Sequence, residues 1–267
     1  MVVLKKTKSR LDQLLVKKDL VESRAKAQAL IMARQVLVNG VVADKAGAVF
    51  ADDVDVVIKE VMPFVSRGGL KLEKALREFD VNITDKVCLD VGASTGGFTD
   101  CLLQNGAKKV FCVDVGYGQL HWKIRNDPRV VNFERENFRH FDISKITDPI
   151  EVVVMDVSFI SVKKLIPKIA EILSGLTAPR LHGPAVLVIL VKPQFEAGPK
   201  NVGKGGVVRD EKVRERVLLD VTEFVLKQGF ENIHITQSPI TGADGNVEYL
   251  LSATWSLRAN TVSVAIS

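Results

Sequence analysis

The stretch VCLDVGASTGGFTDCLL, residues 87–103, decides the fold. It begins with an apolar run of the kind that forms a buried β-strand, passes through a turn of small residues, and continues as a helix-like sequence. Glycine at positions 92, 96 and 97 lets the backbone turn sharply and lets a ligand approach the main chain closely. The stretch therefore predicts a ligand site where a strand passes into a helix.

Apolar strand-like segments recur throughout the rest of the chain and alternate with helical sequence. There are seven of them: KVCLDVG, KKVFCVDVG, RVVNFE, IEVVVMDVSF, AVLVILVKPQF, ENIHITQ and EYLLSAT. Strands that are rich in valine and isoleucine on both faces, and that are separated by helices, are typical of a mostly parallel sheet covered on each side. We therefore predict an α/β fold for residues 67–267.

The first sixty residues follow a different pattern. Leucines at 11, 14 and 15, and apolar residues at 27, 30 and 31, have the spacing of two short amphipathic helices, and Ser23 is a suitable N-cap for the second. Asn39-Gly40, between two apolar runs, predicts a tight hairpin. Residues 1–60 are thus expected to form a small α+β domain. Pro63 breaks the periodicity, so we expect a linker at 61–66.

Charge is unevenly distributed along the chain. Residues 1–34 contain nine Lys or Arg against three acids, a charge of +6, so with a total of +5 the remaining residues sum to about −1. A small basic lobe on a nearly neutral body fits a module that binds a polyanion, because Lys and Arg release counterions from phosphates. A solvated lysine-rich surface would have the same composition, and charge alone does not separate the two.

Composition also argues against several classes of protein. No apolar run approaches the roughly 20 residues that a membrane-spanning helix requires, and the N-terminus lacks a signal-peptide pattern, so we expect a cytoplasmic protein with no membrane partner. The three cysteines lie inside apolar segments without the paired spacing of metal ligands. We predict buried thiols and no metal site.

Polar residues gather at the expected strand ends. The first strand ends in Asp90-Val91-Gly92, and Gly96 and Gly97 open the next helix, whose free N–H groups favour an electron-rich group. The second strand ends in Asp114, where a carboxylate is able to accept hydrogen bonds from ribose hydroxyls. Since ligands of open α/β sheets bind at the carboxyl ends of strands, these residues predict one shared site. The spacing is not the G-x-G-x-x-G of dinucleotide enzymes.

This arrangement resembles S-adenosylmethionine-dependent methyltransferases, and DVGASTGGFTDCLL is similar to the glycine motif of the FtsJ-type RNA methyltransferases. Together with RLDQLL, SRGGLKLEKAL, DVGYGQL, DVSFIS, LVKPQFEAG, VGKGGVVRD and SPITGADGNVEYLL, it makes residues 4–255 closely resemble the TlyA family. The resemblance implies a Rossmann-like domain with a mostly parallel seven-stranded sheet, preceded by an S4-like RNA-binding domain. It further implies 2′-O-methylation of cytidine in ribosomal RNA by S-adenosylmethionine; the family also carries the label hemolysin.

The resemblance implies a catalytic tetrad of Lys71, Asp156, Lys192 and Glu248. The residues themselves support it, because Asp156 and Lys192 end apolar strands, where an unpaired charge would be expensive to bury. We expect Lys192 to activate the ribose 2′-oxygen, Asp156 to orient it, and Lys71 and Glu248 to position the ribose. Which lysine takes the proton stays open.

The resemblance also implies a cofactor site and an RNA site. The cofactor residues are Asp90, Gly92, Ser94, Thr95, Gly96, Phe98, Asp114, Tyr117 and Asn137, with Gln119 as a weaker choice. Glu136 and Asp142 compete with Asn137 for the adenine amino group. Arg10, Arg24 and Lys26 are the expected RNA contacts. The glycine-rich basic loop 196–210 would either close over RNA or serve as a connector.

Two other functions remain as alternatives. A membrane-active toxin, as the hemolysin label suggests, would need an amphipathic or spanning segment, whereas the apolar stretches here are short and strand-like. An RNA-binding regulator with an inactive methyltransferase fold would be expected to have lost the glycine turn or the tetrad, and both are intact. The expected partner is ribosomal RNA or a ribosomal subunit; nothing in the sequence indicates the oligomeric state.

Overall fold

The computed structural model describes residues 7–59, 62–177 and 183–256. The chain divides into two compact units, residues 1–62 and 63–267, and each is described by itself. The domain boundary and the start of the linker predicted at residues 60 and 61 lie outside the described residues.

The N-terminal unit packs two short helices against small strands. Its elements are β1 (Lys8–Arg10), α1 (Leu11–Lys17), α2 (Arg24–Met32), β2 (Val36–Val38), β3 (Val41–Ala43), β4 (Val49–Ala51) and β5 (Val56–Ile58). The predicted features are present: Ser23 caps α2 by accepting a hydrogen bond from the Lys26 N–H, and Asn39 and Gly40 turn between antiparallel β2 and β3 with positive φ angles. The leucines of α1 are fully buried in the core of this unit.

The second unit is built on a seven-stranded sheet. Its strands are β6 (Val87–Val91), β7 (Lys109–Asp114), β8 (Val130–Glu134), β9 (Val152–Met155), β10 (Ala185–Val191), β11 (Phe230–Gln237) and β12 (Tyr249–Trp255). Their spatial order is β11-β12-β10-β9-β6-β7-β8. Pairing is parallel from β10 to β8, while β12 runs antiparallel to both β10 and β11. The predicted mostly parallel α/β sheet is confirmed.

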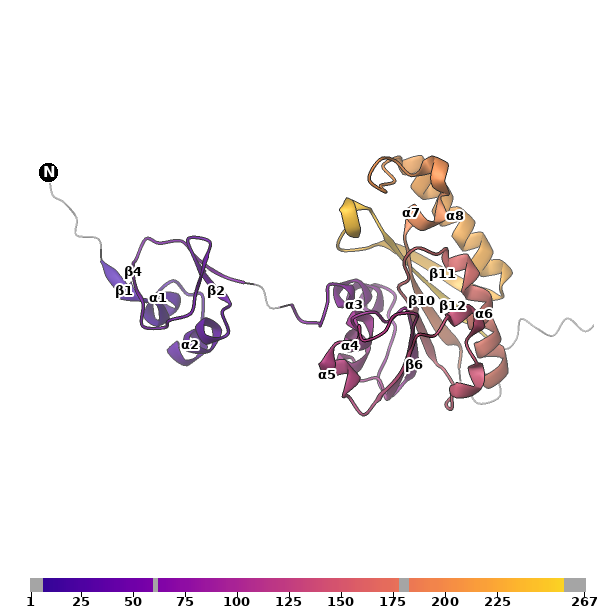
Figure 1. Ribbon diagram of the computed structural model, residues 1–267, viewed down its shortest axis with the longest axis horizontal. Helices are drawn as coiled ribbons and strands as arrows, with labels where there is room; N and C mark the ends of the chain where they lie inside the picture. The colour runs from indigo at the N-terminus through magenta and orange to yellow at the C-terminus, as the bar shows by residue number, and fades with distance from the viewer. Residues whose placement is uncertain (1–6, 60–61, 178–182, 257–267) are drawn as a thin grey trace, which may run out of the picture. The chain divides into compact units, whose positions relative to one another are not determined.

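Helices cover both faces of this sheet, with α3 to α5 on one face and α6 and α8 on the other (Figure 1). They are α3 (Gly68–Glu78), α4 (Gly97–Gln104), α5 (Trp122–Arg125), α6 (Ile166–Ile172), α7 (Pro193–Glu196) and α8 (Glu211–Lys227). Short 3₁₀ segments lie at Phe138–His140, Ile143–Lys145, Val162–Lys164, Pro199–Asn201 and Ala243–Gly245, and a π-helical turn at Leu173–Thr177. No helix in the described ranges is long and apolar enough to cross a membrane.

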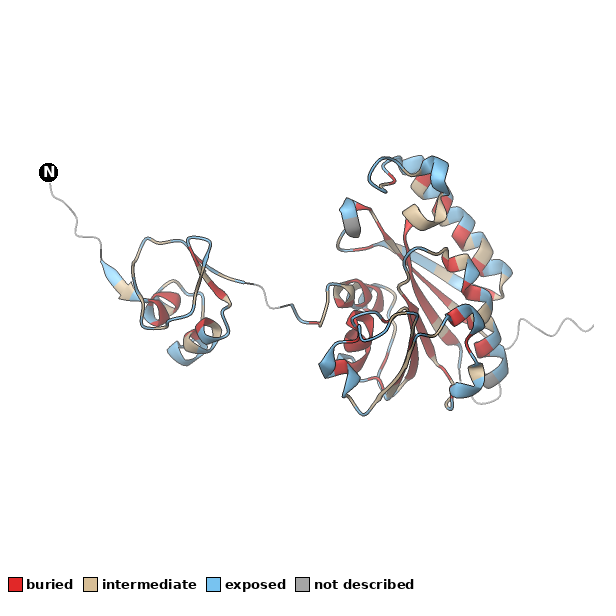
Figure 2. Ribbon diagram, viewed as in Figure 1, coloured by how far each residue is buried: buried red, intermediate tan, exposed pale blue. Residues whose placement is uncertain are grey.

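The central strand β6 shows why its sequence is apolar on both faces. Val87, Leu89 and Val91 belong to the core that includes α6 and α8, whereas Cys88 belongs to the core beneath α3 and α4. The buried residues accordingly run along the strands and line one side of each covering helix (Figure 2). All three cysteines are free and buried, as predicted.

The order of the strands in the seven-stranded sheet indicates where a ligand would bind. After β6 the chain builds β7 and β8 on one side, and then crosses to add β9 on the other. Ligands of open α/β sheets bind where the order reverses in this way, at the carboxyl ends of the strands. Here that point lies between the turn after β6 and the residues that follow β9.

Candidate active site

The turn after β6 is shaped by backbone that only small residues adopt easily. Gly92 and Gly96 have φ angles of 83° and 91°, and Ser94 between them has a φ of 49°. A Cβ atom on Gly92 would lie 2.6 Å from the backbone oxygen of Asp156, the residue after β9. The turn is therefore packed directly against the end of β9, and a larger side chain would push the two apart.

Asp114, at the end of β7, is fixed beside this turn. Its two carboxylate oxygens accept hydrogen bonds of 2.7 Å from the N–H groups of Ser94 and Gly116. A carboxylate that accepts one bond per oxygen still has lone pairs free for ligand hydroxyls. Asp114 lines a cavity of about 400 Å³ together with Gln119, Glu136, Asn137, Phe138 and Leu165.

The four residues of the predicted tetrad line a second cavity of about 480 Å³. Lys71 Nζ lies 2.5 Å from Glu248 Oε2, and Lys192 Nζ lies 2.7 Å from Asp156 Oδ1. Lys71 comes from α3, Lys192 follows β10 and Glu248 precedes β12, so only the folded chain brings them together. The side chains of both lysines are about 10% exposed, so each ion pair is largely desolvated yet faces the cavity.

Ser158 joins the tetrad, and the sequence analysis did not select it. Lys192 Nζ donates a 2.8 Å hydrogen bond to Ser158 Oγ. Its contact with Asp156 Oδ1 is an ion pair whose alignment falls outside that of a hydrogen bond. The ammonium is thus held from two sides. The signal was present in the DVSFIS motif, two residues after Asp156, but a serine after a strand has many other uses.

The two cavities adjoin. Both are lined by Gly92, Ser94, Asp156, Ser158 and Phe159. Thr95 and Phe98 line the tetrad side. The glycine turn therefore separates a mostly apolar compartment containing Asp114 from a compartment containing two ammonium and two carboxylate groups.

Three predicted cofactor residues line neither cavity. Gly96 forms the N-cap of α4. Tyr117 is 67% exposed and stacks against the guanidinium of Arg135, 4.0 Å from its ring centre. Asp90 is fully buried beneath the turn, where Thr99 Oγ1 donates a 2.6 Å hydrogen bond to it.

Burial governs the charge of Asp90. Desolvation raises its pKa to about 7, and the hydrogen bond from Thr99 only partly opposes this. Its Oδ1 atom has no hydrogen-bond partner among the described residues. Asp90 therefore supports the turn from below, and a protonated carboxyl is favoured there at acidic pH.

The residues considered for adenine recognition separate in the structure. Asn137 and Glu136 both line the cavity that contains Asp114. Asn137 Oδ1 also accepts a hydrogen bond from the Arg139 N–H, and Glu136 is ion-paired with Lys145. Asp142 instead caps a 3₁₀ turn through Ser144 and lines neither cavity.

In the N-terminal unit, the predicted RNA contacts Arg10 and Arg24 share one carboxylate. Asp12 is fully buried and accepts hydrogen bonds from Arg10 (3.1 Å), Arg24 (2.9 Å) and Gln28 (3.0 Å). The arginine side chains remain 47% and 53% exposed. Lys26 is exposed, and only its backbone N–H takes part in the α2 cap.

Comparison with known proteins shows which families the chain is related to. Residues 64–255 match the FtsJ-like methyltransferase family and residues 9–49 match the S4 domain family. The chain is 42% identical to the 16S/23S rRNA (cytidine-2'-O)-methyltransferase TlyA of Mycobacterium tuberculosis over 91% of its own length and 89% of that protein. The chain belongs to the TlyA family.

Two further relatives resemble the chain over nearly its whole length. Hemolysin A of Brachyspira hyodysenteriae is 45% identical to the chain, over 90% of the chain and 98% of that protein. Among solved structures, a candidate hemolysin from Streptococcus thermophilus is 42% identical, with a TM-score of 0.69 over 94% of this chain and 90% of the other. The predicted methyltransferase fold and S4 domain of this TlyA-family chain are confirmed.

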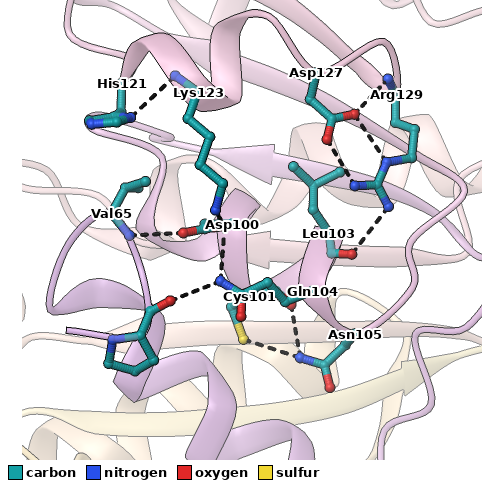
Figure 3. Close-up of polar contacts among 11 residues, drawn as sticks. Val65, Asp100, Cys101, Leu103, Gln104, Asn105, His121, Lys123, Asp127 and Arg129 are labelled. Carbon is teal, nitrogen blue, oxygen red and sulfur yellow. Dashed lines mark hydrogen bonds and ion pairs between the residues drawn. The ribbon is translucent and has the colours of Figure 1, made fainter. Parts of the chain in front are cut away.

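The FtsJ-like match begins at the segment that leads into α3, and this segment is docked onto α4. Asp100, 2% exposed, accepts a 2.8 Å hydrogen bond from the Val65 N–H and pairs with Lys123, and Gln104 donates to the Pro63 carbonyl (Figure 3). Phe64 is buried in the same core. In this TlyA-family chain the predicted linker residues 63–66 are thus part of the methyltransferase unit, and Ser66 reaches the tetrad cavity.

Proposed function

We propose that the protein transfers a methyl group from S-adenosylmethionine to the ribose 2′-hydroxyl of a cytidine in ribosomal RNA. The observation that carries this proposal is the pair of lysine–carboxylate contacts in one cavity, next to the glycine turn and Asp114. The M. tuberculosis relative, named for cytidine 2′-O-methylation of 16S and 23S rRNA, supports the substrate.

The two compartments fit the cofactor. In the proposal Asp114 binds the ribose hydroxyls of S-adenosylmethionine, and Asn137 or Glu136 binds its adenine amino group. Gly92, Ser94, Thr95 and Phe98 line the path toward the tetrad and accommodate the methionine part. Gly92 and Ser94 line both cavities, which supports this placement. When bound, the cofactor supplies an electrophilic methyl group.

In the proposal the tetrad makes the ribose hydroxyl a better nucleophile. A 2′-hydroxyl is a weak nucleophile at neutral pH, and a fixed ammonium stabilises negative charge that develops on its oxygen. In the proposal Lys192, held by Asp156 and Ser158, faces the 2′-oxygen and stabilises the charge on it while the oxygen takes the methyl group from the sulfonium, and the hydroxyl proton leaves to solvent. Lys71 and Glu248, which line the same cavity, position the ribose, so alignment for attack adds to the rate.

The S4 domain gives the proposal its RNA-binding part. Its net positive charge over residues 1–34 and the exposed guanidinium groups of Arg10 and Arg24 suit contacts with phosphates. Such contacts orient an RNA without reading its sequence. The choice of nucleotide would then depend on the methyltransferase cavity.

The proposal is tested with labelled S-adenosylmethionine and ribosomal subunits from a strain that lacks this activity. We expect label in RNA, at a linkage that resists alkali, because a 2′-O-methyl group blocks attack on the neighbouring phosphate. Label on a base would show that the protein methylates a base and not a ribose hydroxyl. Neither label nor cofactor binding would favour an RNA-binding regulator with an inactive fold.

A further inference from the structure

A glycine-rich segment forms part of the rim of the tetrad cavity. We call residues 203–208, GKGGVV, the glycine arch. The arch is folded on itself: Gly203 N–H donates to Val207 O at 3.0 Å, and Gly206 N–H donates to Gly203 O at 3.1 Å. Gly206 lines the tetrad cavity, while Lys204 within the arch is exposed. The arch therefore connects a solvent-facing ammonium to the cavity wall.

One buried amide ties the arch to the opposite loop. Asn246 is 3% exposed; its Oδ1 accepts a 3.1 Å hydrogen bond from the Val208 N–H, and its Nδ2 donates a 3.0 Å bond to the Gly206 carbonyl. An asparagine side chain offers a donor and an acceptor together, so it satisfies both backbone groups at once. An aliphatic or purely acidic side chain would not.

The same residue anchors the loop that carries Glu248. The Asn246 carbonyl accepts a 2.9 Å hydrogen bond from the Gly242 N–H, and Glu248 follows two residues later. Gly242 lies against the carboxylate, since a Cβ there would be 2.0 Å from Glu248 Oε1. Asn246 is therefore bonded on one side to the arch and on the other to the turn that encloses a tetrad residue.

The far end of the arch is also fixed. Arg214 of α8 donates hydrogen bonds to the carbonyls of Val208 (3.2 Å) and Arg209 (2.8 Å). Holding the arch before substrate arrives avoids the entropy cost of ordering it on binding. Loop 196–210 was expected either to close over RNA or to serve as a connector, and the bonds at residues 203–209 favour a segment that is held in place before RNA binds.

We propose that Asn246 is a positioning residue that couples the glycine arch to the Glu248 loop, so that Lys204 meets the RNA backbone at a fixed distance from the tetrad. The inference rests on the proposed function and adds a coupling between RNA contact and ribose placement. Asn246 itself lines the tetrad cavity, and its proposed role runs through its bonds to Gly206, Val208 and Gly242.

A double-mutant cycle tests the coupling. In the otherwise native protein, Lys204→Ala should raise KM for ribosomal subunits several-fold, since one phosphate contact is lost. Asn246→Ala should lower kcat by roughly tenfold to a hundredfold, because small displacements in an active site are costly. In the Asn246→Ala background, Lys204→Ala should change KM little. Additive effects on KM would overturn the proposal.

Two further variants separate positioning from general damage. Asn126→Ala removes an exposed side chain that donates to the Trp122 carbonyl and lines neither cavity, and it should leave kcat and KM unchanged. Asn246→Asp keeps the acceptor for Val208 but places a carboxylate oxygen against the Gly206 carbonyl, so its kcat should fall at least as far as that of Asn246→Ala. S-adenosylmethionine affinity, measured by calorimetry, should stay within twofold in all of them.

The experiment distinguishes failure of the proposed coupling from failure of the proposed function. If the native protein methylates no RNA, the proposed function fails. If it does, and Asn246→Asp matches the native kcat and KM, only the coupling is wrong. If Asn246→Ala unfolds at the assay temperature, the cycle is run with Asn246→Asp, and additivity there again overturns the coupling.

Discussion

The chain buries two carboxylates against cations in two different ways. In the S4 domain, Asp12 is fully buried, but its partners Arg10 and Arg24 remain about half exposed. In the methyltransferase domain, Glu248 is 2% exposed and its partner Lys71 is only 10% exposed. The first arrangement holds cations at the surface, whereas the second holds a cation in a cavity.

This difference separates two functions of the same electrostatic pairing. An exposed guanidinium that is fixed by a buried carboxylate keeps donors for a second anion that arrives from solvent. A desolvated ammonium acts only on a group that enters its cavity, where the lower dielectric strengthens its effect. In the proposed function the exposed arginines therefore serve RNA binding, and the desolvated lysine serves the chemistry.

Removing the cavity cation should have the largest effect. Lys192→Ala deletes the group held by Asp156 and Ser158, so methyl transfer to RNA should fall by about 10² to 10⁴-fold. The rate is measured at saturating subunits and cofactor. The matched control is Lys86→Ala, since Lys86 pairs with Glu151 at the opposite end of the strands and is 39% exposed. Near-native transfer by Lys192→Ala would reject its role.

Moving the cavity carboxylate should have a smaller effect than deleting a cation. In Gly242→Ala the new methyl group would overlap Glu248 Oε1, so Glu248 must shift away from Lys71, and we expect kcat to fall by roughly tenfold to a hundredfold. Gly183→Ala is the control, because its Cβ would meet open space. Equal rates for the two variants would show that the position of Glu248 is unimportant.

The surface cluster should respond in binding and not in chemistry. Asp12→Asn releases the two arginines, so affinity for ribosomal RNA should drop by about tenfold while kcat at saturation stays unchanged. Filter binding over a range of salt concentrations measures this. Asp55→Asn, an exposed site in the same unit, makes the same charge change and should have little effect.

Asp12 also gives a pH signature. The hydrogen bond from Arg10 holds the pKa of Asp12 well below its usual range. A lowered folded-state pKa stabilises the protein above the unfolded value, near pH 4, and this contribution is lost as the pH falls further. Acid unfolding of Asp12→Asn should lack that part of the pH dependence, and an unchanged acid profile would count against the pairing.

The smallest expected effect concerns a third carboxylate, Asp90, which is buried without a cation as its partner. Because burial raises the pKa of Asp90 to about 7, its contribution to stability is fully present below about pH 4, declines toward pH 7 and is lost above it. In cofactor-free protein, Asp90→Asn should therefore raise Tm relative to native more at pH 8 than at pH 5, by about 2–4 °C per kcal/mol. Exposed Asp85→Asn should show no such difference; if Asp90→Asn behaves like it, burial does not raise the pKa of Asp90.

Much of the fold could be predicted from local sequence. The seven strands follow the apolar segments, the hairpin forms at Asn39-Gly40, and Ser23 caps its helix. These features depend on neighbours within a few residues, where alternation, turn chemistry and capping act. The four tetrad residues were found by resemblance to a family, and their convergence in one cavity was visible only in the folded chain.

Other parts of the candidate site could not be predicted from the sequence, for physical reasons. Ser158 and Asn246 act through hydrogen bonds to residues more than thirty positions away, and nothing in their local sequence specifies those partners. Tyr117, expected at the cofactor, stacks against Arg135 and lines neither cavity, and nothing in its local sequence specifies that contact. Asp90 sits at a strand end, as the pattern predicted, but the alternation of the strand turns it toward Thr99 beneath the turn.

The sequence by itself determined the secondary structure, the small basic domain and the glycine turn, because each follows from short-range sterics, periodicity and charge. The tertiary structure decided which charges lie in the cavity and which on the surface. That choice depends on burial and on partners brought together across the sheet, such as Lys71 and Glu248, 177 residues apart. Desolvation and hydrogen-bond satisfaction, which are properties of the packed molecule, therefore set the chemistry of each carboxylate.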